Sequence, residues 1–268
     1  MWLFFALLSA LFYSFRRISE KKLTSHVEHF TLGWAVQAFS LPIIILLLFG
    51  TTLPNLFSLS LTHFWLPLFI IWLILYPVQA YFYYQSLKQK DISHVLPLMS
   101  LIPVFSLFFS WILLKEAPTS IGFVGILSIG SVLDKIAIKV SAPLFYNFIN
   151  TLGASLILFL FAKRANPRLL ATVKKNGKSL AVVGTFQALG FTLYIISLTT
   201  GLVSYVTAIK SANVVLAGVW GIVILHEHLT KQRLLSLLFV FLGIVLLGVQ
   251  SKELSLMRLV IHSLHHRH

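Results

Sequence analysis

Long apolar stretches, separated by short polar or Pro/Gly-containing connectors, run through nearly the whole chain. There are nine, at about 2–22, 29–49, 63–86, 92–114, 119–141, 143–163, 178–199, 203–225 and 231–250. A helix needs about 20 apolar residues to cross the hydrocarbon core of a bilayer, and none of these stretches alternates as a strand would. Because lipid offers no partner to free backbone groups, the pattern predicts an all-α fold. We expect a polytopic membrane helix bundle with nine apparent transmembrane helices.

The composition points the same way. The 268 residues are 58% hydrophobic and only 10% charged, with a mean hydropathy of +0.91, whereas soluble proteins are about 25% charged. The absence of cysteine excludes a disulfide scaffold, a thiolate metal site and a cysteine nucleophile. On so apolar a chain, the net charge of +14 indicates basic cytoplasmic loops rather than nucleic-acid binding. We therefore expect a multi-pass protein of the plasma (bacterial inner) membrane, with the lipid bilayer as its partner and no nucleic acid.

The two ends of the chain and one loop refine this interpretation. The first stretch has no positive charge before its apolar run, and Arg16 and Arg17 follow it, so we expect a retained first helix rather than a signal peptide. The segment 163–178 is the only sizeable basic loop, which favours a cytoplasmic position. The basic, histidine-containing tail 251–268 is expected to be a frayed terminus.

The chain also contains an internal repeat. Shifting residues 86–116 by 111 positions lays them on 197–227 without a gap, and Tyr83 then coincides with Tyr194. A weaker match, at a shift of 119, sets Arg16 on Lys135. Duplicated halves are typical of transporters, whose polar site lies near the membrane midplane between the repeats. We assign a first repeat to 1–118 and a second to 119–250, with 117–141 as a shared or shortened junction.

Three passages resemble a known family. They are the opening helix running into Arg16, the segments 83–87, 97–104 and 114–116, and the segments 205–211, 225–227 and 243–248. Together they resemble EamA-type members of the drug/metabolite transporter superfamily, over about residues 2–250. The resemblance implies two five-helix repeats of opposite orientation and transport of small metabolites, often export of amino-acid-like solutes.

The junction departs from the family's ten helices, because only the 25 residues of 117–141 stand where the fifth and sixth helices belong. At 1.5 Å per residue they cross once, which would make the halves parallel. Alternatively, the segment is a re-entrant hairpin centred near Gly130. If Lys135 and Lys139 then lie on the side of the basic loop, the twenty lysines and arginines other than Lys210 divide sixteen to four. A deletion that ruined the fold is the third possibility.

Lys210 is the most informative polar residue in a predicted helix. It lies about seven residues into the stretch 203–225, roughly 10 Å deep. A charge there costs a few kcal/mol unless it faces a cavity or a counter-charge. It would hold a substrate carboxylate or gate the route, unless it snorkels to the interface. Asn213 follows on the same face and is a second candidate for substrate binding.

Few acidic residues are available to pair with Lys210. Asp134 and Glu20 occur in corresponding parts of the two repeats, and we expect one of them to approach it. Local pairs, of Asp134 with Lys135 or of Glu20 with Arg16, are the alternative.

Further polar side chains lie on the stretches that the resemblance assigns to the central cavity. Amides and phenols suit a site that binds and releases a polar solute, although hydrogen bonding between helices explains them nearly as well. These candidates are Gln79, Tyr83, His94, Gln187 and Tyr194.

Nothing in the sequence indicates an enzyme. His226, Glu227 and His228 lack the spacing of a zinc helix, and no nucleophile motif or phosphate-binding loop occurs. We expect no catalytic residue, metal or cofactor. The prediction is a secondary transporter that moves a small metabolite by alternating access, in the direction of export, and that can form a homodimer. The alternative is a non-transporting or degenerate membrane paralogue that serves as a partner protein.

Overall fold

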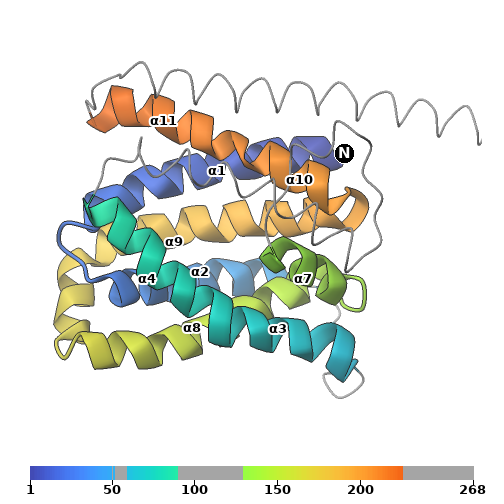
Figure 1. The fold of residues 1–268 in the computed structure, drawn as a ribbon, viewed down its shortest axis with the longest axis horizontal. Coiled ribbons are helices and arrows are strands. Elements are labelled where there is room, and N and C mark those ends of the chain that lie inside the picture. The colour runs from blue at the N-terminus through green and yellow to red at the C-terminus, as the bar shows by residue number, and fades with distance from the viewer. Residues whose placement is uncertain (50, 52–58, 90–128, 226–268) are drawn as a thin grey trace, which may run out of the picture.

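The described chain is an all-helical bundle whose longer helices lie roughly along one axis (Figure 1). The computed structural model describes residues 1–49, 51, 59–89 and 129–225. In chain order its elements are α1 (Trp2–Leu23), α2 (His29–Leu48), the π-helical η2 (Leu61–Trp65), α3 (Leu66–Ile70), the π-helical η3 (Ile71–Leu75), α4 (Tyr76–Gln89), α7 (Ile129–Ile138), α8 (Pro143–Ala165), α9 (Leu169–Thr200), α10 (Val203–Lys210) and α11 (Ala212–Leu225). This confirms the all-α prediction for these residues.

Local sequence signals set several helix ends. The Glu28 carboxylate accepts hydrogen bonds from the backbone N–H groups of Phe30 and Thr31 at 3.0 and 2.8 Å, which caps the start of α2. Pro143 occupies the first turn of α8, where its missing N–H costs nothing. Gly201 follows the last residue of α9.

The basic segment 163–178 is not the loop that the sequence suggested. Its first residues end α8, and α9 already begins at Leu169. Leu169 is buried and Val173 packs against the core, so this segment has an apolar side that composition alone conceals. Only three residues, 166–168, separate the two helices.

Five of the described helical segments are long and apolar enough to cross a membrane. They are His29–Leu48, Leu61–Gln85, Pro143–Ala165, Leu169–Thr200 and Tyr205–Leu225. Large apolar side chains on their outer faces are exposed, among them Leu46 (72%), Leu160 (63%) and Val223 (60%), as expected where lipid replaces water. The predicted spans 92–114 and 231–250 lie outside the described residues. Whether the chain has nine or ten transmembrane helices therefore stays a prediction.

The two halves run in opposite directions. The Asn166 amide donates to the Thr31 hydroxyl at 3.3 Å, so the end of α8 lies beside the start of α2. Lys21 donates to the Leu87 carbonyl at 2.6 Å, which places the end of α4 at the same end of the bundle as the end of α1. The end of α9 lies at the other end, where Gly201 packs beside Trp2 at the start of α1. The parallel arrangement implied by nine crossings is therefore wrong, and the inverted arrangement implied by the resemblance holds for the described helices.

The hairpin interpretation of the junction also needs correction. Gly130 lies inside α7 and is not the tip of a turn. Lys135 donates to the Gly201 carbonyl at 2.6 Å, so it lies at the opposite end of the bundle from the segment 163–178. The proposed placement of Lys135 with the basic loop is thus wrong. Residues 117–128 of the junction lie outside the described part.

Small residues allow the helices to approach closely. A methyl group on Gly153 of α8 would lie 2.2 Å from the ring of Trp72, whose indole N–H donates to the Asn150 carbonyl at 3.0 Å. In α9, Gly184 faces the backbone of Phe39 in α2 at a similarly short distance. Close backbone approach at small residues is a common way for membrane helices to associate.

Candidate functional site

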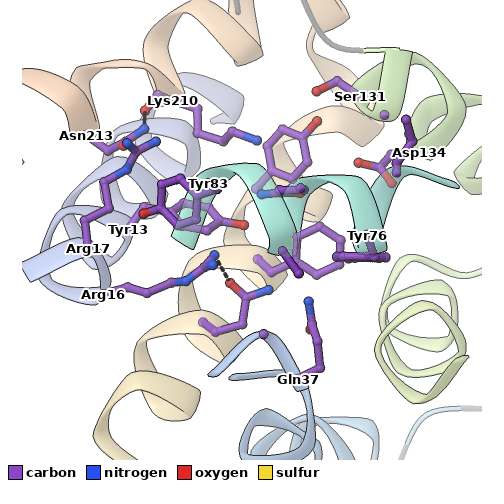
Figure 2. A pocket seen from close by; sticks show the side chains of 18 of the residues that line it. Tyr13, Arg16, Arg17, Gln37, Tyr76, Tyr83, Ser131, Asp134, Lys210 and Asn213 are labelled. Carbon is purple, nitrogen blue, oxygen red and sulfur yellow. Dashed lines mark hydrogen bonds between the residues drawn. The ribbon is translucent and has the colours of Figure 1, made fainter. Parts of the chain in front are cut away.

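A cavity of about 330 Å³ lies between the two halves of the bundle (Figure 2). Side chains from α1, α2 and α4 of the first half line it, together with others from α7, α9, α10 and α11 of the second half. The two helices related by the internal repeat, α4 and α9, therefore both contribute side chains to the cavity lining. Tyr83 reaches the cavity from α4, and Tyr194 reaches it from α9.

The structure brings most of the predicted site residues to this one cavity. Its lining includes Gln79, Tyr83, Asp134, Gln187, Tyr194, Lys210 and Asn213. Glu20 is not part of the lining, and His94 lies outside the described residues. The residues that the internal repeat, the depth of Lys210 and the family resemblance pointed to therefore lie in one place. Their roles in binding stay predictions.

Lys210 does not snorkel out of the bundle. Its ammonium lies 3.6 Å from the centroid of the Tyr194 ring and 5.5 Å from that of Tyr13. Such contacts with desolvated aromatic faces are worth about 2 kcal/mol, which offsets part of the cost of burying the charge. Within the described chain, no carboxylate oxygen lies within 4.0 Å of this ammonium.

Asp134 faces the same cavity from α7, and Figure 2 shows it and Lys210 approaching from opposite sides. The Tyr146 hydroxyl donates to Asp134 Oδ1 at 2.5 Å. Asp134 is only 7% exposed. Lys210 and Asp134 thus share the cavity without forming a direct ion pair, and Arg16 and Arg17 of α1 also line it.

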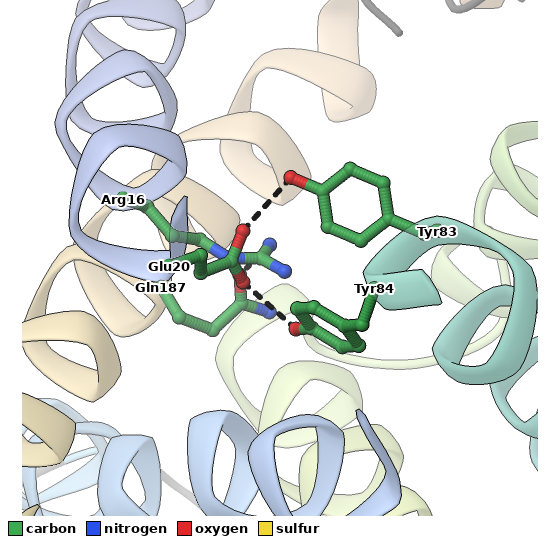
Figure 3. Close-up of polar contacts among 5 residues, drawn as sticks. All are labelled: Arg16, Glu20, Tyr83, Tyr84 and Gln187. Atoms are coloured by element: carbon green, nitrogen blue, oxygen red, sulfur yellow. Dashed lines mark hydrogen bonds and ion pairs between the residues drawn. The ribbon is translucent and has the colours of Figure 1, made fainter. Parts of the chain in front are cut away.

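Glu20 belongs to a separate polar cluster beside the cavity (Figure 3). Arg16 Nε donates to Glu20 Oε1 at 2.8 Å, and the hydroxyls of Tyr83 and Tyr84 donate to Glu20 Oε2 and Oε1 at 2.9 and 2.8 Å. Arg16 Nη1 also donates to Gln187 Oε1 at 2.5 Å. The sequence left open whether Glu20 approaches Lys210 or pairs locally with Arg16, and the structure shows the local pair.

Four buried polar atoms have no hydrogen-bond partner among the described residues, and all four belong to residues that line the cavity. They are Gln37 Oε1, Tyr194 OH, Thr207 Oγ1 and Asn213 Oδ1. Each of these residues is at most 4% exposed. A buried polar atom left unpaired costs about 1–3 kcal/mol. All four lie around one cavity, which is thus where the unpaired buried polar atoms of the described residues are concentrated.

The sequence reasoning missed several lining residues. Arg16 and Arg17 were interpreted as the basic end of the first span, but α1 continues to Leu23 and both arginines line the cavity. Tyr76 could have been found, because the shift of 111 that pairs Tyr83 with Tyr194 also pairs Tyr76 with Gln187. Ser211 also carries a repeat signal, because the same shift sets Ser100 on it. The remaining missed polar lining residues carry no comparable signal; they are Tyr13, Gln37, Tyr84, Ser131 and Thr207.

Within residues 1–49, 51, 59–89 and 129–225, no group of three or more histidine, aspartate or glutamate side chains could hold a metal ion. The charged residues of the cavity lining are Arg16, Arg17, Asp134 and Lys210. The rings of Tyr13, Tyr83 and Tyr194 contact its cationic side chains.

Comparison with known proteins agrees with the geometry. No curated protein matches the chain significantly. The family described as the EamA-like transporter family matches it twice, over residues 1–131 and 126–249. The two matches correspond to the two halves that the internal repeat and the inverted helices reveal. The chain therefore belongs to the EamA-like transporter family and is a multi-pass membrane transporter of the drug/metabolite type.

Proposed function

We propose that this protein is a secondary transporter that exports a small amino-acid-like or amphipathic solute across the plasma (bacterial inner) membrane. The solute occupies the cavity between the two halves. Lys210, Asn213, Gln79, Gln187, Tyr83 and Tyr194 contribute to its binding.

The unpaired polar atoms carry this proposal. A structural core satisfies its buried polar groups, whereas Gln37, Tyr194, Thr207 and Asn213 each leave an atom without a partner at the cavity. A solute with donors and acceptors would offer partners to these atoms. Because it must also be released, the site benefits from neutral amides and hydroxyls, which bind a polar solute without holding it permanently.

The charges narrow the solute class. A carboxylate suits the Lys210 ammonium, and an ammonium group suits the Asp134 carboxylate on the other side of the cavity. The rings of Tyr13 and Tyr194 beside Lys210 offer apolar faces to a side chain. This arrangement favours an amino-acid-like zwitterion with an apolar body.

The inverted halves support alternating access. Two halves of opposite direction around one central site can exchange conformations, so that the site opens first to one side and then to the other. The sequence contains no nucleotide-binding loop, and we propose that a solute or ion gradient supplies the energy.

Counterflow in proteoliposomes tests the transport proposal. Vesicles loaded with a mixed amino-acid pool should take up labelled solute faster than empty vesicles, and the uptake should saturate. Absence of counterflow for every amino acid and for a broad metabolite extract would favour the non-transporting membrane paralogue.

A matched series of probes tests the solute class. Phenylalanine, 3-phenylpropionate and 2-phenylethylamine share one aromatic skeleton and carry a zwitterionic, an anionic and a cationic head group. If both Lys210 and Asp134 bind the solute, phenylalanine should compete best in wild-type protein. The Lys210→Gln variant should then favour the amine, and the Asp134→Asn variant should favour the carboxylate. Equal competition by all three probes would rule out charge recognition.

A further inference from the structure

The cluster around Glu20 has a place in the bundle that substrate binding does not explain. Glu20 is fully buried and does not line the cavity. Its carboxylate accepts hydrogen bonds from the hydroxyls of Tyr83 and Tyr84 and forms an ion pair with Arg16. Burying a carboxylate in this way is expensive unless each contact is kept. These contacts connect α1 with α4, and Arg16 extends them to Gln187 in α9 (Figure 3).

The cluster lies between the cavity and one end of the bundle. Glu20 is in the last turn of α1, one turn beyond the cavity-lining Arg16. Beyond Glu20, Lys21 donates to the Leu87 carbonyl of α4 at 2.6 Å. The same end of the bundle carries the basic segment 163–178, because the end of α8 contacts the start of α2. The last two turns of α1 and α4 are thus joined across the path from the cavity to the basic end.

We propose that Glu20 is a latch that keeps the cavity closed toward the basic end. The hydroxyls of Tyr83 and Tyr84 are the two hydrogen-bond donors that hold its carboxylate. Opening on this side requires α4 to move away from α1, which breaks both hydrogen bonds to the carboxylate. This assigns Tyr83 a gating contact in addition to its place in the cavity lining. The inference rests on the proposed alternating access and identifies where one of its two gates lies.

Arg16 connects the latch to the cavity. Its Nε holds Glu20, while the residue itself lines the cavity and contacts Gln187. A carboxylate in the cavity can accept from the remaining donors of this guanidinium, because Arg presents several donors in one plane. Arg16 therefore connects a bound anionic group with the carboxylate of Glu20 through one side chain.

Cysteine accessibility tests the latch without knowledge of the substrate. The chain has no native cysteine, so Ser211→Cys provides a single, nearly isosteric reporter in the cavity lining. A membrane-impermeant maleimide is applied to oriented vesicles from each side in turn. Glu20→Gln should raise labelling from the basic side about tenfold and lower labelling from the other side, since losing a charge-assisted hydrogen bond shifts a two-state equilibrium by about that factor.

Matched variants separate a gate from a general loss of packing. Tyr84→Phe removes one of the two hydrogen bonds to Glu20, so it should shift labelling in the same direction as Glu20→Gln but by less. The Tyr83→Phe, Tyr84→Phe double variant removes both and should shift labelling as much as Glu20→Gln. Tyr81→Phe, on the exposed face of the same helix, should leave labelling unchanged. Labelling that rises equally from both sides shows loosened packing and overturns the latch, and so does unchanged labelling in all variants. Counterflow measured in parallel reports on the transport proposal separately, because a transporter gated elsewhere retains counterflow without these shifts.

Discussion

The ammonium of Lys210 rests on the face of the Tyr194 ring, 3.6 Å from its centroid, in a cavity where no described carboxylate lies within 4.0 Å of it. A charge inside a membrane protein costs about 3 kcal/mol, and a desolvated cation–π contact returns about 2 kcal/mol. Lys210 is therefore compensated by the rings of Tyr194 and Tyr13 and not by a counter-charge in contact, which leaves it well placed to receive an anionic group.

This arrangement gives an expectation for Lys210→Met. Met keeps an apolar stem and removes a charge that no described carboxylate contacts within 4.0 Å, so the thermal midpoint should change little. Solute counterflow should fall by at least about tenfold, since the lost charge-assisted contact is worth about 1.5–3 kcal/mol. Lys210→Arg keeps the charge and should retain more activity. A Lys210→Met variant with unimpaired counterflow would remove this residue from the site.

The hydrogen bond between Tyr146 and Asp134, in contrast, is expected to contribute to stability. The hydroxyl donates to the buried carboxylate at 2.5 Å, so Tyr146→Phe should lower the free energy of unfolding by about 2 kcal/mol. In an Asp134→Asn background the same substitution should cost less, because the charged acceptor is gone. A double-mutant cycle of unfolding free energies measures the coupling. Additive effects would show that the hydrogen bond contributes little.

How much of this site the sequence could predict depends on the kind of signal. Tyr83, Tyr194 and Lys210 were found because a repeat or a charge in an apolar run marks them individually. Gln37 and Thr207 were not, because a polar residue in a helix is informative only when its neighbours in space are known. Their role appears in the structure as unpaired buried atoms.

The fold shows the same division. Helix positions follow from local apolar runs, so α2, α8 and α11 lie close to the predicted stretches. The direction of the halves depends on the number of crossings in the junction, which one short segment controls. An error there reverses everything that follows. Nine crossings would put the segment 163–178 on the side opposite the end of α1, whereas both lie at one end of the bundle.

Packing between α9 and α2 gives a stability prediction with an internal control. A methyl group on Gly184 would lie 2.5 Å from Phe39 Cβ and 2.6 Å from its carbonyl carbon, so backbone would have to move. Gly184→Ala should lower the free energy of unfolding by about 1–3 kcal/mol. Gly177 lies in the same helix with nothing within 4 Å of the added methyl, so Gly177→Ala should be neutral or stabilising by up to about 1 kcal/mol. Equal effects at both positions would contradict this close approach.

The inverted halves predict which connections share a side of the membrane. The loop after α1 and the short connection between α8 and α9 lie at one end of the bundle, and the loop after α7 lies at the other. In this cysteine-free chain, Ser25→Cys and Ala165→Cys should react with an impermeant maleimide from the same side, and Lys139→Cys should react from the opposite side. The side shared by Ser25 and Ala165 should be cytoplasmic, because the basic segment 163–178 lies there and positive charge is retained on that face.

Detergent solubilisation before labelling serves as the control for this sidedness experiment, because all three cysteines should then react fully. Halves of equal direction would place residues 25 and 165 on opposite sides, since the second half would enter the membrane from the same face as the first. That result would contradict the hydrogen bond between Asn166 and Thr31, which requires the end of α8 beside the start of α2. The labelling pattern therefore tests the arrangement on which both the shared cavity and the latch at Glu20 depend.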